Sequence, residues 1–557
     1  MWNNSCKISH DNHTHPLVVL HPSTRLGSNI NNHQHQQHQQ RRYQHTKQQG
    51  YQSIGSFHSD NLGVLMSLSN SDYQAPTLPF APDEFQSIYQ NHQEGHRRTL
   101  VSSSISSSSI SLSEHFLLDL DQWTFLNHGA FGAALRVGCQ RAEQWRYYLE
   151  RQPLRYFDRD LLPHLAHANR CLANFSSSSS SSSSDSIQVR QGMTLIQNAT
   201  VGLNTVLRGF AREYGTSSSN SSSCTHVILW DTSYGSVKKL ALHIFGKNQV
   251  TEIPLQKKYL HRFKHVRDPT TVFLEALDDT MKELRIRDGS KQILLILDHT
   301  TSNTAINMPI NVIATHAKDT YGKDTVQVLV DGAHGLLAQE LNLDDFYSSN
   351  DNDNALPKAP IDYYISNGHK WLSCPRGVAM LFCPHEHLRD TVLSEPAIIS
   401  HGVDENDLFS RFVWDGTRDY AAALALPVVL DFWKDRGIDS VRTTMKNNLM
   451  QGIQSLVDQW HEQDCQQHDW LQQDITLVPP SLLSPMALVR LPRKLCGSLD
   501  DPKTSNDAKL VQDFLFDRRI EVPIKCINGQ LYVRVSCHMY NTLDNFNRLG
   551  EVLTTMQ

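Results

Sequence analysis

The segment Val326-Gln-Val-Leu-Val-Asp-Gly-Ala-His334 is an apolar run of strand length that ends in an aspartate and a glycine. Near-continuous apolar runs of this kind suit strands that are buried on both faces of a sheet. Their alternation with helical stretches predicts an α/β domain with a mainly parallel sheet. Three further runs share this character: Thr225–Trp230, Gln292–Leu297 and Gly377–Phe382.

Three of the four runs lead straight into or end next to an aspartate: Asp231, Asp298 and Asp331. In open α/β sheets the ligand lies at the carboxyl ends of the strands, so chemistry is expected at these positions. The alternative is that each aspartate begins a turn or caps a helix.

A lysine follows another strand-like run, Ile361-Asp-Tyr-Tyr-Ile-Ser-Asn-Gly-His-Lys-Trp-Leu372. We expect Lys370 to be partly buried, which lowers the pKa of the amine and makes it a nucleophile toward carbonyl groups. This segment alone fits a surface lysine in a turn equally well. Asp331 shifts the balance, because pyridoxal-phosphate (PLP) enzymes need a carboxylate against the pyridine nitrogen as well as a lysine.

A phosphate site is expected at Asn198-Ala199-Thr200, which opens a stretch with helical periodicity. The first turn of a helix offers unpaired N–H groups and a favourable dipole to a phosphate, and Thr200 adds a hydroxyl. The alternative for Thr200 is a plain N-cap.

The sequence resembles the class-V aminotransferase family of fold-type I PLP enzymes, and within it the isopenicillin N epimerase-like and cysteine desulfhydrase-like branch. The resemblance covers about residues 120–557 and depends on the order of its motifs, since each alone is weak. The motifs are Phe125–Gly132, Asp331–His334, Asn367–Leu372 with Pro375–Gly377, Trp414–Asp419, and Tyr532–Ser536 with Tyr540–Thr542.

The resemblance implies a large domain at 115–395, including an N-terminal arm, with a mainly parallel seven-stranded sheet flanked by helices. A smaller α+β domain is expected at 396–557. Residues 1–112 are low in complexity and are expected to form a disordered tail, whose removal should leave activity intact. Two serine runs, 176–184 and 217–223, are interpreted as flexible loops. The His/Gln tract at 31–38 is more typical of biased composition than of a metal site, and no metal is expected.

The roles at the cofactor ring follow from the resemblance. Lys370 resembles the lysine that holds PLP as a Schiff base, with His369 as a support beside it. Asp331 resembles the partner of the pyridine nitrogen, and His334 lies where relatives place a Gln or His near the ring hydroxyl. Tyr234 occupies the position of a side chain that stacks on the ring.

Three further cofactor contacts are implied by the same resemblance. Ser302 is expected near the cofactor hydroxyl, and Thr200 resembles a phosphate ligand. Thr417 resembles the residue that reaches the phosphate from the partner subunit, which implies a homodimer.

The substrate is expected to be a small molecule, an amino acid. Arg534 resembles the arginine that binds its carboxylate by a bidentate fork, and Asn127 and His128 are expected on the substrate side. A C–S lyase acting on cysteine or a cysteine derivative is favoured, and an epimerase, an aminotransferase and a cysteine desulfurase are alternatives. The surroundings of Cys496 do not match the mobile cysteine of a desulfurase. An inactive binding protein with this fold is disfavoured, because it would be expected to lose the lysine or the aspartate.

Composition excludes several other classes. The formal net charge of −6 does not favour a nucleic-acid partner, and no apolar run is long enough to span a membrane. None of the ten cysteines forms a CxxC pair, which favours a reducing compartment, by default the cytoplasm, with organelle targeting left open. No GxGxxG follows a strand, and neither a P-loop nor a GxSxG motif is present.

Overall fold

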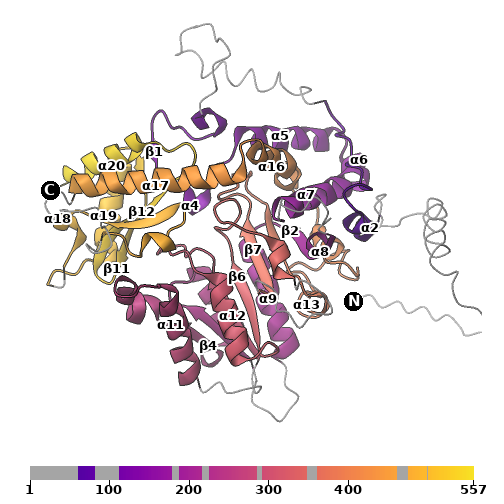
Figure 1. The fold of residues 1–557 in the computed structure, drawn as a ribbon. Helices are drawn as coiled ribbons and strands as arrows, with labels where there is room; N and C mark the ends of the chain where they lie inside the picture. Colours follow the sequence, from indigo (N-terminus) through magenta and orange to yellow (C-terminus); the bar gives the residue numbers. More distant parts are fainter. Residues whose placement is uncertain are drawn as a thin grey trace, which may run out of the picture. The chain divides into compact units, whose positions relative to one another are not determined.

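A seven-stranded sheet forms the centre of the computed structural model, which describes residues 61–81, 112–177, 187–215, 225–284, 292–347, 360–460, 475–498 and 500–556 (Figure 1). Its strand order is β2-β8-β7-β6-β5-β3-β4, and β8 alone among them runs against its neighbours. The predicted mainly parallel seven-stranded sheet is therefore confirmed. Its strands are β2 (Met193–Ile196), β3 (Thr225–Trp230), β4 (Val250–Ile253), β5 (Gln292–Asp298), β6 (Val326–Asp331), β7 (Tyr363–Asn367) and β8 (Ala379–Phe382).

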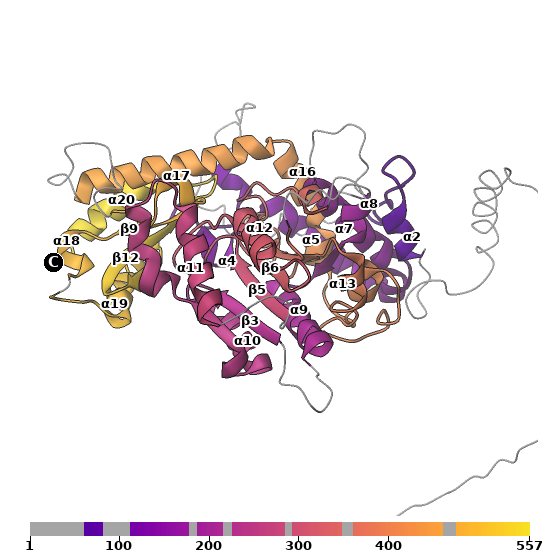
Figure 2. The ribbon, with the colours of Figure 1, turned by 60° about the horizontal axis from the view of Figure 1, so that its bottom comes forward.

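Helices cover both faces of this sheet (Figure 2). Successive side chains of β3 point to opposite faces, so Val227 joins one hydrophobic cluster and Ile228 joins the other. This double burial explains why the strands read as continuous apolar runs. The covering helices are α9 (Ala199–Tyr214) and α10 (Gly235–Phe245) on the side of Val227, and α11 (Thr270–Glu283) and α12 (Ile310–Tyr321) on the side of Ile228.

Three of the stretches that lie outside the described residues connect to the sheet at one edge. Residues 216–224 lead into β3, 285–291 into β5, and 348–359 precede β7. All three therefore connect at the amino ends of parallel strands, opposite the edge where Asp298 and Asp331 end β5 and β6. Most residues of the two predicted serine loops, 176–184 and 217–223, lie outside the described residues.

The C-terminal part has its own antiparallel sheet, which confirms the predicted α+β character. Its strand order is β11-β12-β9, with bounds Ile524–Ile527, Gln530–Ser536 and Met486–Arg490. A long helix, α17 (Ile438–Trp460), packs along α20 (Leu543–Thr554), as Figure 1 shows. The helix α19 (Ser505–Phe516) packs against β11.

Three short helices that follow the predicted border at 395/396 still contact elements of the large part. The short helix α14 (Leu408–Val413) packs against β2, and α15 (Ala421–Leu424) and α16 (Leu426–Lys434) pack against α5 (Arg136–Arg151) and α7 (Leu161–Phe175). The chain thus leaves the large part only in α17. The described residues, from 61 to 556, belong to one compact unit.

Residues 61–81 are folded, which corrects the prediction that the whole of 1–112 is a disordered tail. This segment, here called the N-terminal strap, contains α2 (Leu62–Ser67), which packs on α7 and α8 (Ile187–Gln191). Leu62, Met66 and Phe80 are buried, and the ring of Phe80 meets Trp145 edge to face with 5.0 Å between centroids. The rest of the predicted tail, including the His/Gln tract, lies outside the described residues.

Two buried arginines hold the strap by its backbone. The Nη1 group of Arg170 donates to the carbonyls of Leu65 and Leu68 at 2.8 and 2.9 Å, and Nη2 of Arg190 donates to Leu68 at 2.9 Å. Carbonyls at the carboxyl end of a helix lack intrahelical partners and attract cations. Two guanidinium groups of the large part therefore bind the carboxyl end of the strap's helix, α2.

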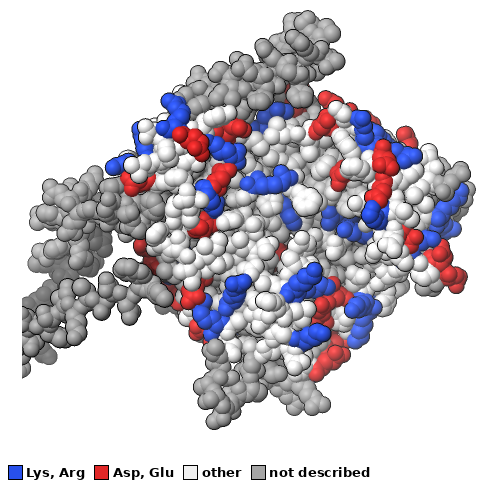
Figure 3. Space-filling model, turned by 180° about the vertical axis from the view of Figure 1, so that it is seen from behind, with Lys and Arg blue, Asp and Glu red and all other residues white. Residues whose placement is uncertain are grey.

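The charge distribution on the surface and the character of the helices are consistent with the predictions made from the net charge and the apolar runs. On the face drawn in Figure 3, acidic and basic side chains mingle around the rim and do not form one continuous basic stripe. Within the described ranges, no helix is both long and apolar enough to cross a bilayer.

Candidate functional site

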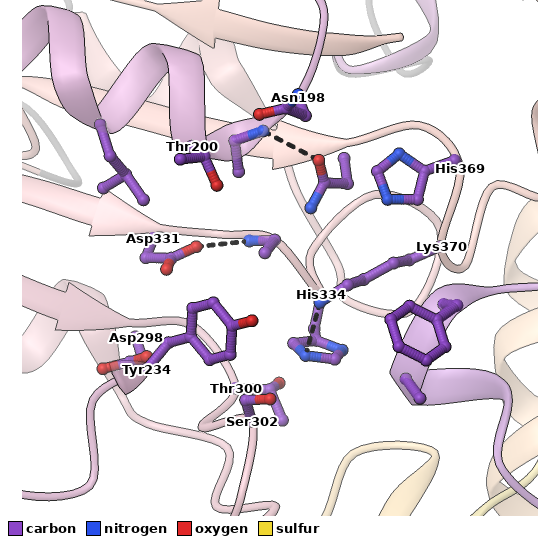
Figure 4. Close-up of a pocket in the computed structure, with 16 residues that line it drawn as sticks. Asn198, Thr200, Tyr234, Asp298, Thr300, Ser302, Asp331, His334, His369 and Lys370 are labelled. Atoms are coloured by element: carbon purple, nitrogen blue, oxygen red, sulfur yellow. Dashed lines mark hydrogen bonds between the residues drawn. The ribbon is translucent and has the colours of Figure 1, made fainter. Parts of the chain in front are cut away.

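A cavity enclosing about 750 Å³, part of it open to solvent, lies at the carboxyl ends of β5, β6 and β7 (Figure 4). This is the position expected for a ligand site in an open α/β sheet. Predicted residues that line it are Thr200, Tyr234, Ser302, Asp331, His334, His369 and Lys370; the cavity also includes Ala130, Phe131, Asn198, Ala199, Leu203, Asp298, Thr300, Ala333 and Asn367.

Lys370 lies in the turn that follows β7 and projects its amine toward His334 (Figure 4). The two nitrogens, Nζ and Nε2, are 3.1 Å apart. Burial lowers the pKa of Lys370 to about 8, although the charge of Asp331 works in the opposite direction. About a tenth of this side chain is therefore a neutral amine at pH 7, and the amine is the form that a nucleophile requires.

Two stacked histidines hold the lysine turn from behind. The Nε2–H groups of His128 and His538 donate to the carbonyls of Lys370 and Trp371, each at 3.1 Å. Their ring centroids are 4.0 Å apart, and burial lowers the pKa of both, so neither ring is charged at neutral pH. His128 was predicted on the substrate side, but it is fully buried and contacts the backbone of the lysine turn instead.

The N-terminal motif approaches the same turn through Gly132. This residue has φ +69°, and a Cβ atom there would lie 1.9 Å from the carbonyl oxygen of His369. Only glycine fits, because both the backbone conformation and the space exclude a side chain.

Two carboxyl groups lie side by side at the ends of β5 and β6, where Asp298 pairs in register with Asp331. Asp331 accepts from the N–H of Ala333 at 3.0 Å, and Asp298 accepts from the hydroxyl of Ser233 at 2.6 Å. Burial raises the pKa of both, and the charge of Asp331 helps to raise that of Asp298 to about 8. Asp298 is therefore mostly protonated at neutral pH, and two buried carboxyl groups so close together do not both ionise readily.

Asp231, the third predicted strand-end aspartate, does not line the cavity. Its carboxylate accepts from the backbone N–H groups of Gln256 and Lys257 at 2.9 and 3.2 Å. It holds the turn after β4, so the structural alternative is correct for this residue.

The amino end of α9 borders the cavity. Asn198 is its N-cap and accepts from the N–H of Val201 at 3.1 Å, while the N–H of Ala199 donates to Asn367 at 2.9 Å. Because Asn198 caps the helix, Thr200 is not needed for that purpose and keeps its hydroxyl at the cavity.

Arg534, on β12, is 4% exposed. Its Nη1 donates to the carbonyl of Ser302, and its Nη2 donates to the side-chain oxygen of Asn127 at 3.1 Å. Asn127 in turn donates to Glu521 at 3.0 Å, which orients its amide. Burial lowers the pKa of Arg534 to about 10, so it stays charged, and no carboxylate among the described residues lies within ion-pair distance of it.

Tyr234 and Thr417 complete the predicted set. Tyr234 reaches the cavity from the loop after β3 and is 49% exposed (Figure 4). Thr417 is exposed and does not line this cavity, although its neighbour Arg418 borders an adjoining hollow that shares His369 with it.

No family model matches the chain. A relative from Arabidopsis thaliana named "L-cysteine desulfhydrase" is 22% identical over 453 residues, which is 77% of this chain and 87% of the relative. Another from the same plant, "Probable L-cysteine desulfhydrase, chloroplastic", is 26% identical over 77% of this chain and 82% of its own length. An isopenicillin N epimerase from Amycolatopsis lactamdurans is 27% identical over 50% of this chain and 64% of its own.

The chain is homologous to cysteine desulfhydrases and isopenicillin N epimerases. This confirms the resemblance that the motifs predicted. Among solved structures, the cystine C–S lyase C-DES is 17% identical with a TM-score of 0.53, covering 78% of this chain and 98% of that one. A cysteine desulfurase from Thermococcus onnurineus NA1 is 13% identical with a TM-score of 0.55, covering 81% and 100%. The fold is that of the fold-type I PLP enzymes.

The residues at the cavity fit PLP. A buried amine is available for a carbonyl group, a carboxyl group lies at a strand end for a ring nitrogen, and a helix N-terminus with a hydroxyl faces the space for a phosphate. The residues that would hold the cofactor in this way are Lys370, Asp331 and Thr200, with Tyr234 beside them.

Proposed function

We propose that this protein is a PLP-dependent enzyme that cleaves the C–S bond of cysteine or a cysteine derivative. The observation that carries the proposal is Arg534, a buried cation beside the lysine cavity without a carboxylate partner among the described residues. A buried charge is costly unless it is paired, so a site of this kind is suited to a ligand carboxylate. The names of the desulfhydrase relatives support the choice of substrate.

The side chains divide the work of such a reaction. PLP, when bound, withdraws electrons from the α-carbon of an amino acid. Arg534 binds the substrate carboxylate, and Asn127 holds the guanidinium in place. Lys370, once its amine is released, is within the cavity to take the α-proton as a base. Asp331 supplies the negative charge that a protonated pyridine nitrogen requires.

A cysteine desulfurase needs a mobile thiol in the site, and the described part of the chain does not provide one. No described cysteine lines the cavity. Cys496 is the last residue of α18 (Arg493–Cys496), where it is only 5% exposed. It is therefore a packed thiol and not the loop cysteine expected from its polar neighbours.

The proposal predicts that the purified protein with PLP converts cysteine and water into pyruvate, ammonia and hydrogen sulfide in equal amounts. Pyruvate can be followed with a coupled reductase and sulfide with a colorimetric reagent. S-substituted cysteine sulfoxides test whether the substrate is a derivative. Slow exchange of the α-proton without these products would indicate an epimerase, as the isopenicillin N epimerase relatives suggest. Amino transfer to a keto acid would contradict both proposals.

Replacing Arg534 by leucine should raise KM and lower kcat/KM by about a hundredfold, because a charge-assisted, bidentate contact to the substrate carboxylate is lost. The PLP content, measured by absorbance, should stay unchanged. Arg518→Leu, at an exposed position of the same part of the chain, is the matched control. A variant of Arg534 with wild-type KM would remove this residue from the site.

We also propose a homodimer, in which Thr417 serves the phosphate site of the second subunit. Its exposure and its absence from the lining of its own subunit's cavity support this assignment. The cytoplasm is the proposed compartment, because the described cysteines are free thiols, as is usual under reducing conditions. The name of the chloroplastic relative keeps an organelle as the alternative.

A further inference from the structure

A chain of two hydrogen bonds runs from Trp371 through His334 to Lys370. The indole N–H of Trp371 donates to Nδ1 of His334 at 3.1 Å, and Nε2 of His334 lies 3.1 Å from Nζ of Lys370. An indole nitrogen can only donate. Nδ1 must therefore offer its lone pair, and a neutral His334 ring must carry its proton on Nε2.

The His334 ring is neutral in this setting. It is 3% exposed, and burial, together with the charge of Lys370, lowers its pKa well below the ordinary value. A proton on Nδ1 would also face the indole N–H of Trp371, donor against donor. The ring thus presents an N–H group, and not a lone pair, to the lysine.

This N–H group discriminates between the two forms of Lys370. An ammonium has three donors and no acceptor, so it would meet Nε2–H of His334 without a hydrogen bond. A neutral amine has a lone pair that accepts from Nε2–H. The 3.1 Å contact therefore matches the amine form of the lysine.

We propose that Trp371 is a positioning residue that holds His334 in its Nε2–H tautomer, and that this tautomer keeps Lys370 as the amine that attacks a carbonyl carbon. The proposed function enters only in naming the carbonyl partner as PLP. The hydrogen-bond chain itself belongs to the protein alone, so it can be tested without turnover.

Other charged or titratable groups face the same two side chains. Two carboxyl groups from strand ends favour the ammonium form of the lysine, and a guanidinium from β12 opposes it. Further histidines face His334 from the N-terminal motif and from the lysine turn. His128 also packs against the ring of Trp371, with 5.1 Å between centroids, so a Trp371 variant must be compared in two backgrounds to isolate the tautomer. These groups are Asp331, Asp298, Arg534, His128 and His369.

The test is the pH dependence of acetylation of Lys370 in the full-length chain prepared without PLP. Acetic anhydride reacts with the amine and not with the ammonium, and mass spectrometry follows the peptide that contains Lys370, with exposed Lys247 as the internal reference. In Trp371→Phe, His334 can move its proton to Nδ1 and accept from the ammonium. The midpoint of the acetylation curve should then rise by about one pH unit.

Making the same Trp371 change in a His334→Phe protein separates this effect from a general loss of packing. His334→Phe removes the hydrogen-bonding ring, so adding Trp371→Phe to it should leave the midpoint where His334→Phe alone places it. An equal rise in both backgrounds would show that Trp371 does not act through His334 and would overturn the proposal. So would an unchanged midpoint in the folded single variant.

If Trp371→Phe does not fold, the tautomer of His334 in the wild-type protein still tests the proposal. Nitrogen-15 spectra of labelled histidine distinguish the two neutral tautomers, and the signals of His334 are those missing from His334→Phe. An Nε2–H tautomer is expected, and an Nδ1–H tautomer contradicts the proposal. Absence of C–S lyase activity would remove the proposed function but would leave both of these results intact.

Discussion

Replacing Lys370 by alanine should abolish the covalent, borohydride-reducible attachment of PLP and lower turnover by at least about a thousandfold. The same side chain attacks the cofactor carbonyl and later takes the substrate proton, and a positioned base alone contributes roughly 10²–10⁴-fold. Mass spectrometry of the borohydride-reduced protein measures the attachment, and pyruvate release measures turnover. PLP should still bind without a covalent link, because Asp331 and Thr200 remain.

Two controls make this result specific. Lys370→Arg keeps a cation in the cavity but cannot form the link, so it should fail in the same way. Lys247→Ala removes an exposed lysine and should behave as wild type. If Lys370→Ala were still reduced to a covalent adduct at the wild-type level, another residue would have to be the attachment site.

Deleting residues 1–81 should unfold or strongly destabilise the protein, whereas deleting 1–50 should leave its stability unchanged. The strap buries Leu62, Met66 and Phe80. Burial of such side chains stabilises by about 1.5–3 kcal/mol each, so their loss amounts to about 5–9 kcal/mol as an upper estimate. Whole domains are stable by only about 5–15 kcal/mol. Activity should therefore not survive removal of 1–112, contrary to the expectation from composition.

Urea unfolding of the two truncated chains measures the difference. Phe80→Ala in the full chain is the matched point variant, and it should cost about 3–5 kcal/mol because its ring packs against Trp145. If the chain that starts after residue 81 unfolded at the wild-type urea concentration, the strap would be an accessory and not part of the core.

The strands that could be predicted from sequence are those buried on both faces. β3, β5 and β6 appear as long apolar runs and were predicted to within one residue at each end. β4, at the edge of the sheet, has the partly exposed sequence Val-Thr-Glu-Ile, which carries no such signal. The strap was missed for a related reason: its apolar run, 62–68, is short, is flanked by long polar segments and becomes buried only through distant partners.

The position of a cavity residue was predictable where one motif supplies it, as for Lys370 and Asp331, which both line the cavity. It was not predictable where function depends on register or on contacts between loops. Asp231 and Asp298 follow similar strands, yet only Asp298 lies beside Asp331, because β5 and not β3 neighbours β6. The contact between Trp371 and His334 joins two turns that are remote in sequence, and the motif that contains each gives no sign of the other.

The undescribed stretches that join the sheet at its amino edge offer places to attach a reporter. β5, with seven residues, separates its first residue, Gln292, from the end at Asp298 by about 23 Å at the usual rise per residue. A fluorophore or an affinity peptide inserted there would be held at the opposite end of the strand from Asp298. Such a handle would allow the protein to be immobilised or observed while its cavity stays open to substrate.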